Sequence, residues 1–147
     1  MALTTATLRA GLSGRVASVS GLREAKGPLG VTLEPSTVID RAYEVEITDD
    51  ADGGERVRAG TRMSVTAQFV VRLVHRLAPK GGAEVRDQAY NDTDAVRRAL
   101  LTHAADGIRE CENTITYGGS SREARGGGVY LLTTMRWAVR YDCSLVA

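Results

Sequence analysis

Two stretches of this 147-residue chain alternate between apolar and polar residues for longer than an ordinary β-strand. Residues 62–77 read RMSVTAQFVVRLVHRL, and residues 129–143 read VYLLTTMRWAVRYDC. Successive side chains of a strand point to opposite faces of its sheet, so each stretch can bury one face. Sixteen residues span roughly 50 Å at about 3.3 Å each, whereas a usual strand has about 5–6 residues. We therefore expect two long strands that bend, break or project beyond the core of their own subunit.

Length and composition indicate one soluble globular domain that spans residues 1–147. The chain is 43% hydrophobic and 25% charged, and its formal net charge is +1. That near-neutral charge argues against a dedicated nucleic-acid binder. The apolar runs are shorter than a membrane span needs, and the N-terminal MALTTATLRAGL lacks the basic and apolar regions of a signal peptide. We expect no association with a membrane.

Local signals predict the remaining elements. A stripe of Leu and Val predicts the first helix, and Asn91 is a good N-cap for the second. The order α-β-β-α-β-β is typical of an α+β fold, in which one antiparallel-rich sheet with two long strands carries both helices on one face. The expected elements are a helix at 3–19, an extended arm at 20–42, a strand at 43–48, a flexible polar loop at 49–60, the long strand at 62–77, a helix from Asn91 to about Gly107, a strand at 111–117, a flexible loop at 118–128 and the second long strand.

The two cysteines are expected to stay unpaired. A hairpin around the loop at 118–128 would place Cys111 near Met135. Cys143 would then lie eight residues further along its strand, roughly 26 Å away. A disulfide needs Cα atoms within about 7 Å, so we expect two free thiols and a reducing compartment.

Negative charge is concentrated in residues 34–55, where eight acidic residues accompany one basic residue. That segment has a formal charge of −7, so the rest of the chain has +8. A solvated strand face followed by an acidic loop explains this pattern. The alternative is an acidic edge that meets a basic edge on a neighbouring copy, because head-to-tail contacts can close into rings. The interface candidates are Asp49, Asp50, Asp52 and Glu55 on the acidic side and Arg122 and Arg125 on the basic side.

No motif in the sequence nominates a catalytic, cofactor or metal site. Asp50 begins a partial match to a calcium loop, but Gly54 and Thr61 stand where that pattern needs ligands. The segment GGSSREARGGG lacks the lysine of a phosphate-binding loop and leads into a strand. The only histidines, His75 and His103, lie on apolar stripes, which is typical of core or interface histidines. We expect no enzyme activity, no cofactor and no bound metal.

The chain resembles the tail terminator (tail completion) proteins of long-tailed bacteriophages and related particles. The likeness covers almost the whole chain. It lies in the N-terminal helix, the arm with GPLGVTLEPSTVIDRAYEVEI, the strand RMSVTAQFVVRLVHRL, the helix NDTDAVRRALLTHAA and the closing hairpin that ends in LLTTMRWAVRYDC.

The resemblance implies a structural virion protein of the tail or neck, present in the host cytoplasm during assembly. Such subunits form a homo-oligomeric ring, usually of six copies, which caps the tail tube and offers a surface to the head–tail connector. The implied partners are therefore further copies of the chain, the tube protein and the connector protein. The resemblance transfers no functional residue position by position, and it leaves open whether DNA passes close to residues in the ring lumen.

Two other functions remain as alternatives. One is another neck or adaptor protein of the head–tail junction. The other is a small-molecule-binding α+β domain, which would show polar groups converging in a sheet-lined pocket near His75 or His103. A nucleic-acid module built on Arg122 and Arg125 is disfavoured by the neutral charge and by the 5% aromatic content.

Overall fold

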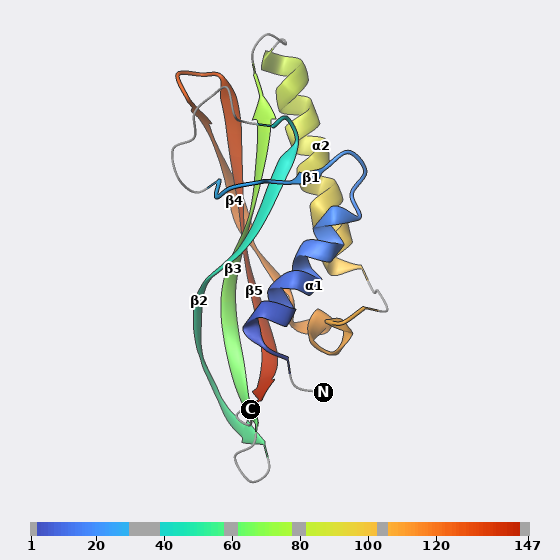
Figure 1. Ribbon diagram of the computed structural model, residues 1–147, viewed down its shortest axis with the longest axis vertical. Helices are drawn as coiled ribbons and strands as arrows, with labels where there is room; N and C mark the ends of the chain where they lie inside the picture. Colours follow the sequence, from blue (N-terminus) through green and yellow to red (C-terminus); the bar gives the residue numbers. More distant parts are fainter. Residues whose placement is uncertain (1–2, 30–38, 58–61, 78–81, 103–105, 145–147) are drawn as a thin grey trace.

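The structure is a computed structural model that describes residues 3–29, 39–57, 62–77, 82–102 and 106–144, with the side chains of 52–57 and 144 outside the description. Two helices pack on one face of a five-stranded sheet (Figure 1). This arrangement confirms the expected α+β class. The elements are α1 (Thr5–Ala17), β1 (Arg23–Glu24), β2 (Ala42–Val57), β3 (Arg62–Arg76), α2 (Gly82–Leu101), the 3₁₀ helix η3 (Arg109–Thr114), β4 (Thr116–Arg125) and β5 (Tyr130–Ser144).

The two long strands, β3 and β5, form the centre of the sheet. The strand order is β1-β2-β3-β5-β4, and only the two-residue β1 is parallel to its neighbour. β3 and β5 are 15 residues each and pair without a break from Arg62↔Ser144 to Arg76↔Tyr130. The prediction of two long strands is therefore confirmed, and both run along the long axis of the molecule (Figure 1).

The main hydrophobic core lies between the sheet and the helices. Phe69 and Trp137 face each other in the β3–β5 register, and their stacked rings have centroids 6.0 Å apart. Burying one such large apolar side chain contributes about 1.5–3 kcal/mol. The alternation that predicted the strands is thus confirmed as a buried face. The main members of the core are Val65, Ala67, Phe69, Val71, Leu73, Met135, Trp137, Val139 and Tyr141 from the strands and Leu8, Leu12, Val16, Val96 and Leu100 from the helices.

A smaller cluster covers part of the opposite face of the sheet. Leu29, beyond β1 in the predicted arm, packs with Val74, Tyr130 and Leu132. The backbone N–H of Leu29 also donates to the carboxylate of Glu44 at 3.2 Å. The arm therefore crosses the sheet edge and packs on the face without helices, while its residues 30–38 lie outside the described part of the chain.

The predicted loop at 49–60 is wrong for its described residues. β2 continues to Val57 and pairs with residues 62–68 of β3. Two register shifts, at Ile47/Asp49 and Asp52/Arg56, take up the extra residues of β2. The polar composition that predicted a loop instead reflects a strand at the exposed border of the sheet, and residues 58–60 lie outside the described residues.

The predicted loop at 118–128 is wrong as well, because β4 extends to Arg125. Gly119 has a φ of +113° beside the register shift at Tyr117/Gly119, so this glycine serves a bulge within the strand. The turn itself uses the three glycines at 126–128, which all have positive φ. A short turn suffices here because glycine adopts these angles at little cost.

The second helix begins earlier than expected. α2 starts at Gly82, and Asn91 is exposed within it rather than capping it. Val85 and Ala89 are buried and extend the apolar stripe of the helix toward its N-terminus. Within the described ranges, no helix is long and apolar enough to cross a membrane.

The cysteine environment also differs from the expected hairpin. Residues 109–114 form η3 rather than the start of a strand, so Cys111 does not lie opposite Met135. Both cysteines are free thiols, Cys111 buried and Cys143 half-buried. Cys143 is opposite Met63 and forms a β-bridge with Leu3.

We predict opposite effects for two glycine substitutions in α1. A Cβ at Gly11 would lie 2.3 Å from Cγ2 of Ile108, a buried residue, whereas a Cβ at Gly14 meets nothing within 4 Å. Gly11→Ala should lower the free energy of unfolding by about 1–2 kcal/mol through overpacking. Gly14→Ala should raise it by about 0.5–1 kcal/mol through helix propensity. Urea unfolding of both variants checks this, and a stabilised Gly11→Ala would contradict the α1–Ile108 packing.

Candidate functional site

The acidic interface candidates run along β2 from the middle of the long strands toward one end. Asp49 and Asp50 are exposed on β2, opposite Gln68 and Ala67 of β3. Asp52 and Glu55 follow on the same strand, toward the β2–β3 connection, with their side chains outside the description. The structure therefore places these acids on a paired strand and not in a loop.

Arg122 and Arg125 lie at the opposite end of the sheet. β4 pairs there with the start of β5, which in turn pairs with the last residues of β3. Arg122 is held within the subunit, because it donates to Thr93 Oγ1 at 2.9 Å and stacks 4.8 Å from the Tyr90 ring centroid. Arg125 is paired with Glu123 at 2.7 Å on the surface of the same strand. The acidic and basic candidates therefore do not meet within one subunit.

Part of the acidic segment is neutralised inside the subunit. Arg72 of β3 forms ion pairs with Glu44, at 2.8 Å, and with Glu46 of β2. Asp40 accepts a hydrogen bond from the backbone N–H of Arg76 at 3.0 Å. The negative charge that remains exposed on the described part of β2 is thus concentrated at Asp49 and Asp50.

A buried ionic cluster joins α2 to the sheet. Asp92 accepts hydrogen bonds from Nη2 and Nε of Arg41, at 2.7 and 3.0 Å, and from Gln88 at 2.9 Å. His75 Nε2 lies 2.7 Å from Asp92 Oδ2, and both side chains are at most 4% exposed. Burial raises the pKa of Asp92, but the hydrogen bonds from His75 and Arg41 outweigh it and bring the pKa to about 2. Asp92 is therefore a charged anchor that holds α2 to β3 and to Arg41, the residue before β2.

This cluster confirms that His75 is a core histidine, whereas His103 lies outside the described residues. Sequence reasoning missed the role of Asp92, which directly follows Asn91, the expected N-cap of a shorter helix. The signal was present, because Asp92 stands three and four residues from Ala89 and Val96 on the buried stripe of α2.

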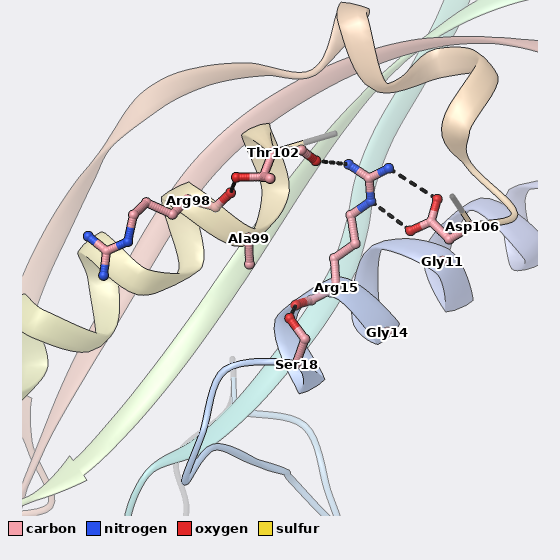
Figure 2. Close-up of a pocket in the computed structure, with 8 residues that line it drawn as sticks. All are labelled: Gly11, Gly14, Arg15, Ser18, Arg98, Ala99, Thr102 and Asp106. Carbon is pink, nitrogen blue, oxygen red and sulfur yellow. Dashed lines mark hydrogen bonds and ion pairs between the residues drawn. The ribbon is translucent and has the colours of Figure 1, made fainter. Parts of the chain in front are cut away.

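A second buried cluster lines a pocket between α1 and α2 (Figure 2). Arg15 forms a bidentate pair with Asp106, at 2.8 and 3.0 Å, and a further pair with Glu112 at 2.9 Å. It also donates to the backbone carbonyls of Leu100 and Thr102, at 3.2 and 3.3 Å. Arg15 thereby ties α1 to the C-terminal end of α2 and to η3, where a positive charge also complements the helix dipole. Its position between Leu12 and Val16 gave no sign of this role.

These clusters do not form a convincing small-molecule site. The pocket of about 590 Å³ is lined by two helices rather than by the sheet, and its polar centre, Arg15, is bonded to protein groups. Burial raises the pKa of the Cys111 thiol to about 11, which disfavours a thiolate nucleophile. Across the described residues, no three His, Cys, Asp or Glu side chains gather as metal ligands. The polar groups instead hold α2 on the sheet and α1 on α2 and η3.

The comparisons with known proteins agree with this fold. No protein family matches the sequence, and no curated protein matches it at significant similarity. One solved structure with a matching fold is described as the virion of a native gene transfer agent (GTA) particle. The TM-score is 0.57 at 13% identity, and the match covers 92% of this chain and 94% of the other. This likeness establishes a shared fold over nearly the full length of both chains.

Proposed function

We propose that this protein is a structural virion protein, a tail terminator that forms a ring on the tail tube and joins it to the head connector. The observation that carries the proposal is the full-length fold likeness to a chain of a gene transfer agent virion. The order of the sequence elements separately resembles tail terminators. The fold likeness supports a part of a virion, the sequence resemblance supports the tail terminator role, and neither depends on the other.

The charge distribution supports a head-to-tail ring. A ring of identical subunits needs two different complementary surfaces on each copy. The exposed acids of β2 and the arginine-bearing β4 lie toward opposite edges of the sheet, as such a contact requires. The buried clusters around Arg15 and Asp92 give each subunit a rigid body on which these surfaces are held.

The first test is the mass of the assembled protein. One chain is 15.7 kDa, so a six-membered ring gives about six times that mass by native mass spectrometry. A terminator added to polymerising tube protein should also shorten the tubes in electron micrographs, because it caps their ends. A ring that leaves tube length unchanged would favour another neck protein of the head–tail junction. A strict monomer, alone and with tube ends, would contradict the proposal.

We predict that reversing two exposed acids weakens the ring. Asp49→Lys with Asp50→Lys should raise the dissociation constant by about tenfold or more at low salt, and by less at high salt, where charges are screened. The matched control reverses Glu84 and Asp87, which are exposed on α2. Native mass spectrometry across a salt series reads out both variants. Equal weakening by both pairs would mean that net charge alone, and not the β2 surface, controls assembly.

A further inference from the structure

β4 is an open edge of the sheet. It pairs with β5 on one side, and among the described residues no backbone hydrogen bond reaches its other side. Such an edge presents unpaired N–H and C=O groups that another strand can bind. The edge is ten residues long, contains no proline and is therefore able to accept a strand.

The opposite edge, β2, is covered over only its first part. β1 pairs with its start, and the Tyr43 carbonyl accepts from Ala25 N–H at 2.8 Å. Arg9 of α1 then donates to the Val45 carbonyl at 3.1 Å. Beyond this point β2 continues to Val57, and this remaining part carries the exposed Asp49 and Asp50.

We propose that β4 of one copy pairs antiparallel with the acidic part of β2, from residue 49 onward, in a neighbouring copy. The sheet then continues from subunit to subunit. This inference rests on the proposed ring and names the contact that holds it together. The occupant of the β4 edge is thus a second copy of this chain.

The strand directions favour this pairing. β3 is antiparallel to β2, β5 to β3, and β4 to β5, so β4 runs opposite to β2 within one sheet. Copies placed side by side in the same orientation therefore bring β4 next to β2 as an antiparallel pair. No copy has to be turned over, which is the condition for repeating one contact around a ring.

One register satisfies both the backbone and the charges. The Arg125 carbonyl accepts from Gly128 N–H at 3.2 Å within the turn to β5, so the backbone groups of the adjacent Ala124 point outward. When Ala124 lies opposite Asp50 of the neighbouring copy, Arg125 lies opposite Asp49 of that copy. The resulting contact pairs opposite charges at the open edge.

The faces of the two sheets match in this register. Asp49 of β2 is opposite Gln68 of β3. Arg125 of β4 is opposite Tyr130 of β5, and Tyr130 is in turn opposite Arg76 of β3. Gln68 and Arg76 alternate with the buried residues of β3, so both Asp49 and Arg125 lie on the face without helices. Arg125 has five N–H donors and can hold Glu123 and the neighbour's carboxylate together. Asp49 and Arg125 lie at different positions along the strand direction of one subunit. Pairing them between copies therefore requires the strands to tilt relative to the ring axis, as in closed barrels.

A mixing experiment tests this contact. Arg125→Asp and Asp49→Arg each place like charges across every contact, so each variant alone should form rings about tenfold to a hundredfold more weakly. In an equimolar mixture, each contact between unlike variants pairs opposite charges again. Native mass spectrometry should then detect mixed rings with equal numbers of the two chains. Failure of the mixture to form rings, while the wild type forms them, overturns this contact and leaves the ring proposal intact.

A backbone variant tests the pairing independently of charge. Ala124→Pro removes an outward N–H at a position where an edge strand tolerates proline, and Ala124→Thr keeps that N–H. The proline variant should keep its circular dichroism spectrum and lose the ring, whereas the threonine variant should retain it. Rings from a folded Ala124→Pro variant would overturn the pairing. If the proline variant does not fold, the mixing experiment with Arg125→Asp and Asp49→Arg tests the contact on its own. A monomeric wild type overturns both the contact and the ring.

Discussion

Replacing Arg15 with methionine should lower the free energy of unfolding by about 3–5 kcal/mol, because it removes one partner of a buried ion pair. Methionine fills a similar volume, but the largely buried Glu112 then loses its ion pair with Arg15. The carbonyls of Leu100 and Thr102 lose a donor as well. A domain of this size has a total stability of about 5–15 kcal/mol, so urea unfolding should show a large shift of the midpoint.

A second arginine on the same helix provides the control. Arg9 is 44% exposed, and its ion pair with Glu24 is 3.5 Å long. Arg9→Met should therefore cost about 1 kcal/mol or less. Adding Glu112→Gln to Arg15→Met should recover part of the loss, since it removes a buried charge that has lost its ion pair with Arg15. Equal effects of Arg15→Met and Arg9→Met would show that the buried cluster does not hold α1 in place.

Replacing Asp92 with asparagine should remove an acid-sensitive part of the stability. The pKa of Asp92 falls from its ordinary 3.8 to about 2 in the folded protein, since His75 and Arg41 outweigh the cost of burial. That difference corresponds to about 2 kcal/mol in favour of the folded, ionised state at neutral pH. Asparagine keeps the shape of the side chain but carries no charge, so Asp92→Asn should lose at least this amount.

The pH dependence follows from the direction of the shift. A lowered pKa stabilises the fold above about pH 4, and this contribution disappears as the pH falls toward about 2. The difference in stability between wild type and Asp92→Asn should therefore shrink over that window. Asp106, whose pKa is lowered by its hydrogen bond from Arg15, adds acid sensitivity to both proteins and cancels in the difference. A constant difference from pH 6 to pH 2 would contradict the ionised anchor.

The fold was predictable where one physical signal dominated. β3 and β5 followed from alternation, because the packing of Phe69 against Trp137 and of their neighbours requires a face of apolar side chains. The segments at 49–57 and 118–125 were not predictable from local composition. Their glycines and acids are typical of loops, and only the long strands beside them supply the backbone partners that make them β-structure.

The candidate site was predictable only in part. Charge in the sequence located the exposed Asp49 and Asp50 and the half-buried Arg125, and their role in assembly stays a prediction. Arg122 looked equivalent to Arg125 in sequence, yet it points toward α2 and contacts Thr93 and Tyr90. Arg15 and Asp92 have partners 91 and 51 residues away in the chain, at Asp106 and Arg41 respectively, and no local pattern reveals such distant pairs.

The central β3–β5 pairing also governs how a newly made chain folds. Residues 62 and 144 pair at one end of this ladder and residues 76 and 130 at the other, so it joins segments 54 to 82 positions apart. The β2–β3 and β4–β5 hairpins are local and close quickly, whereas distant strands meet slowly. We therefore expect docking of the two hairpins to be the slow step of folding. Until it is complete, β2 and β4 do not belong to the same sheet, so under the proposed assembly we expect newly made chains to enter a ring only after their own centre has closed.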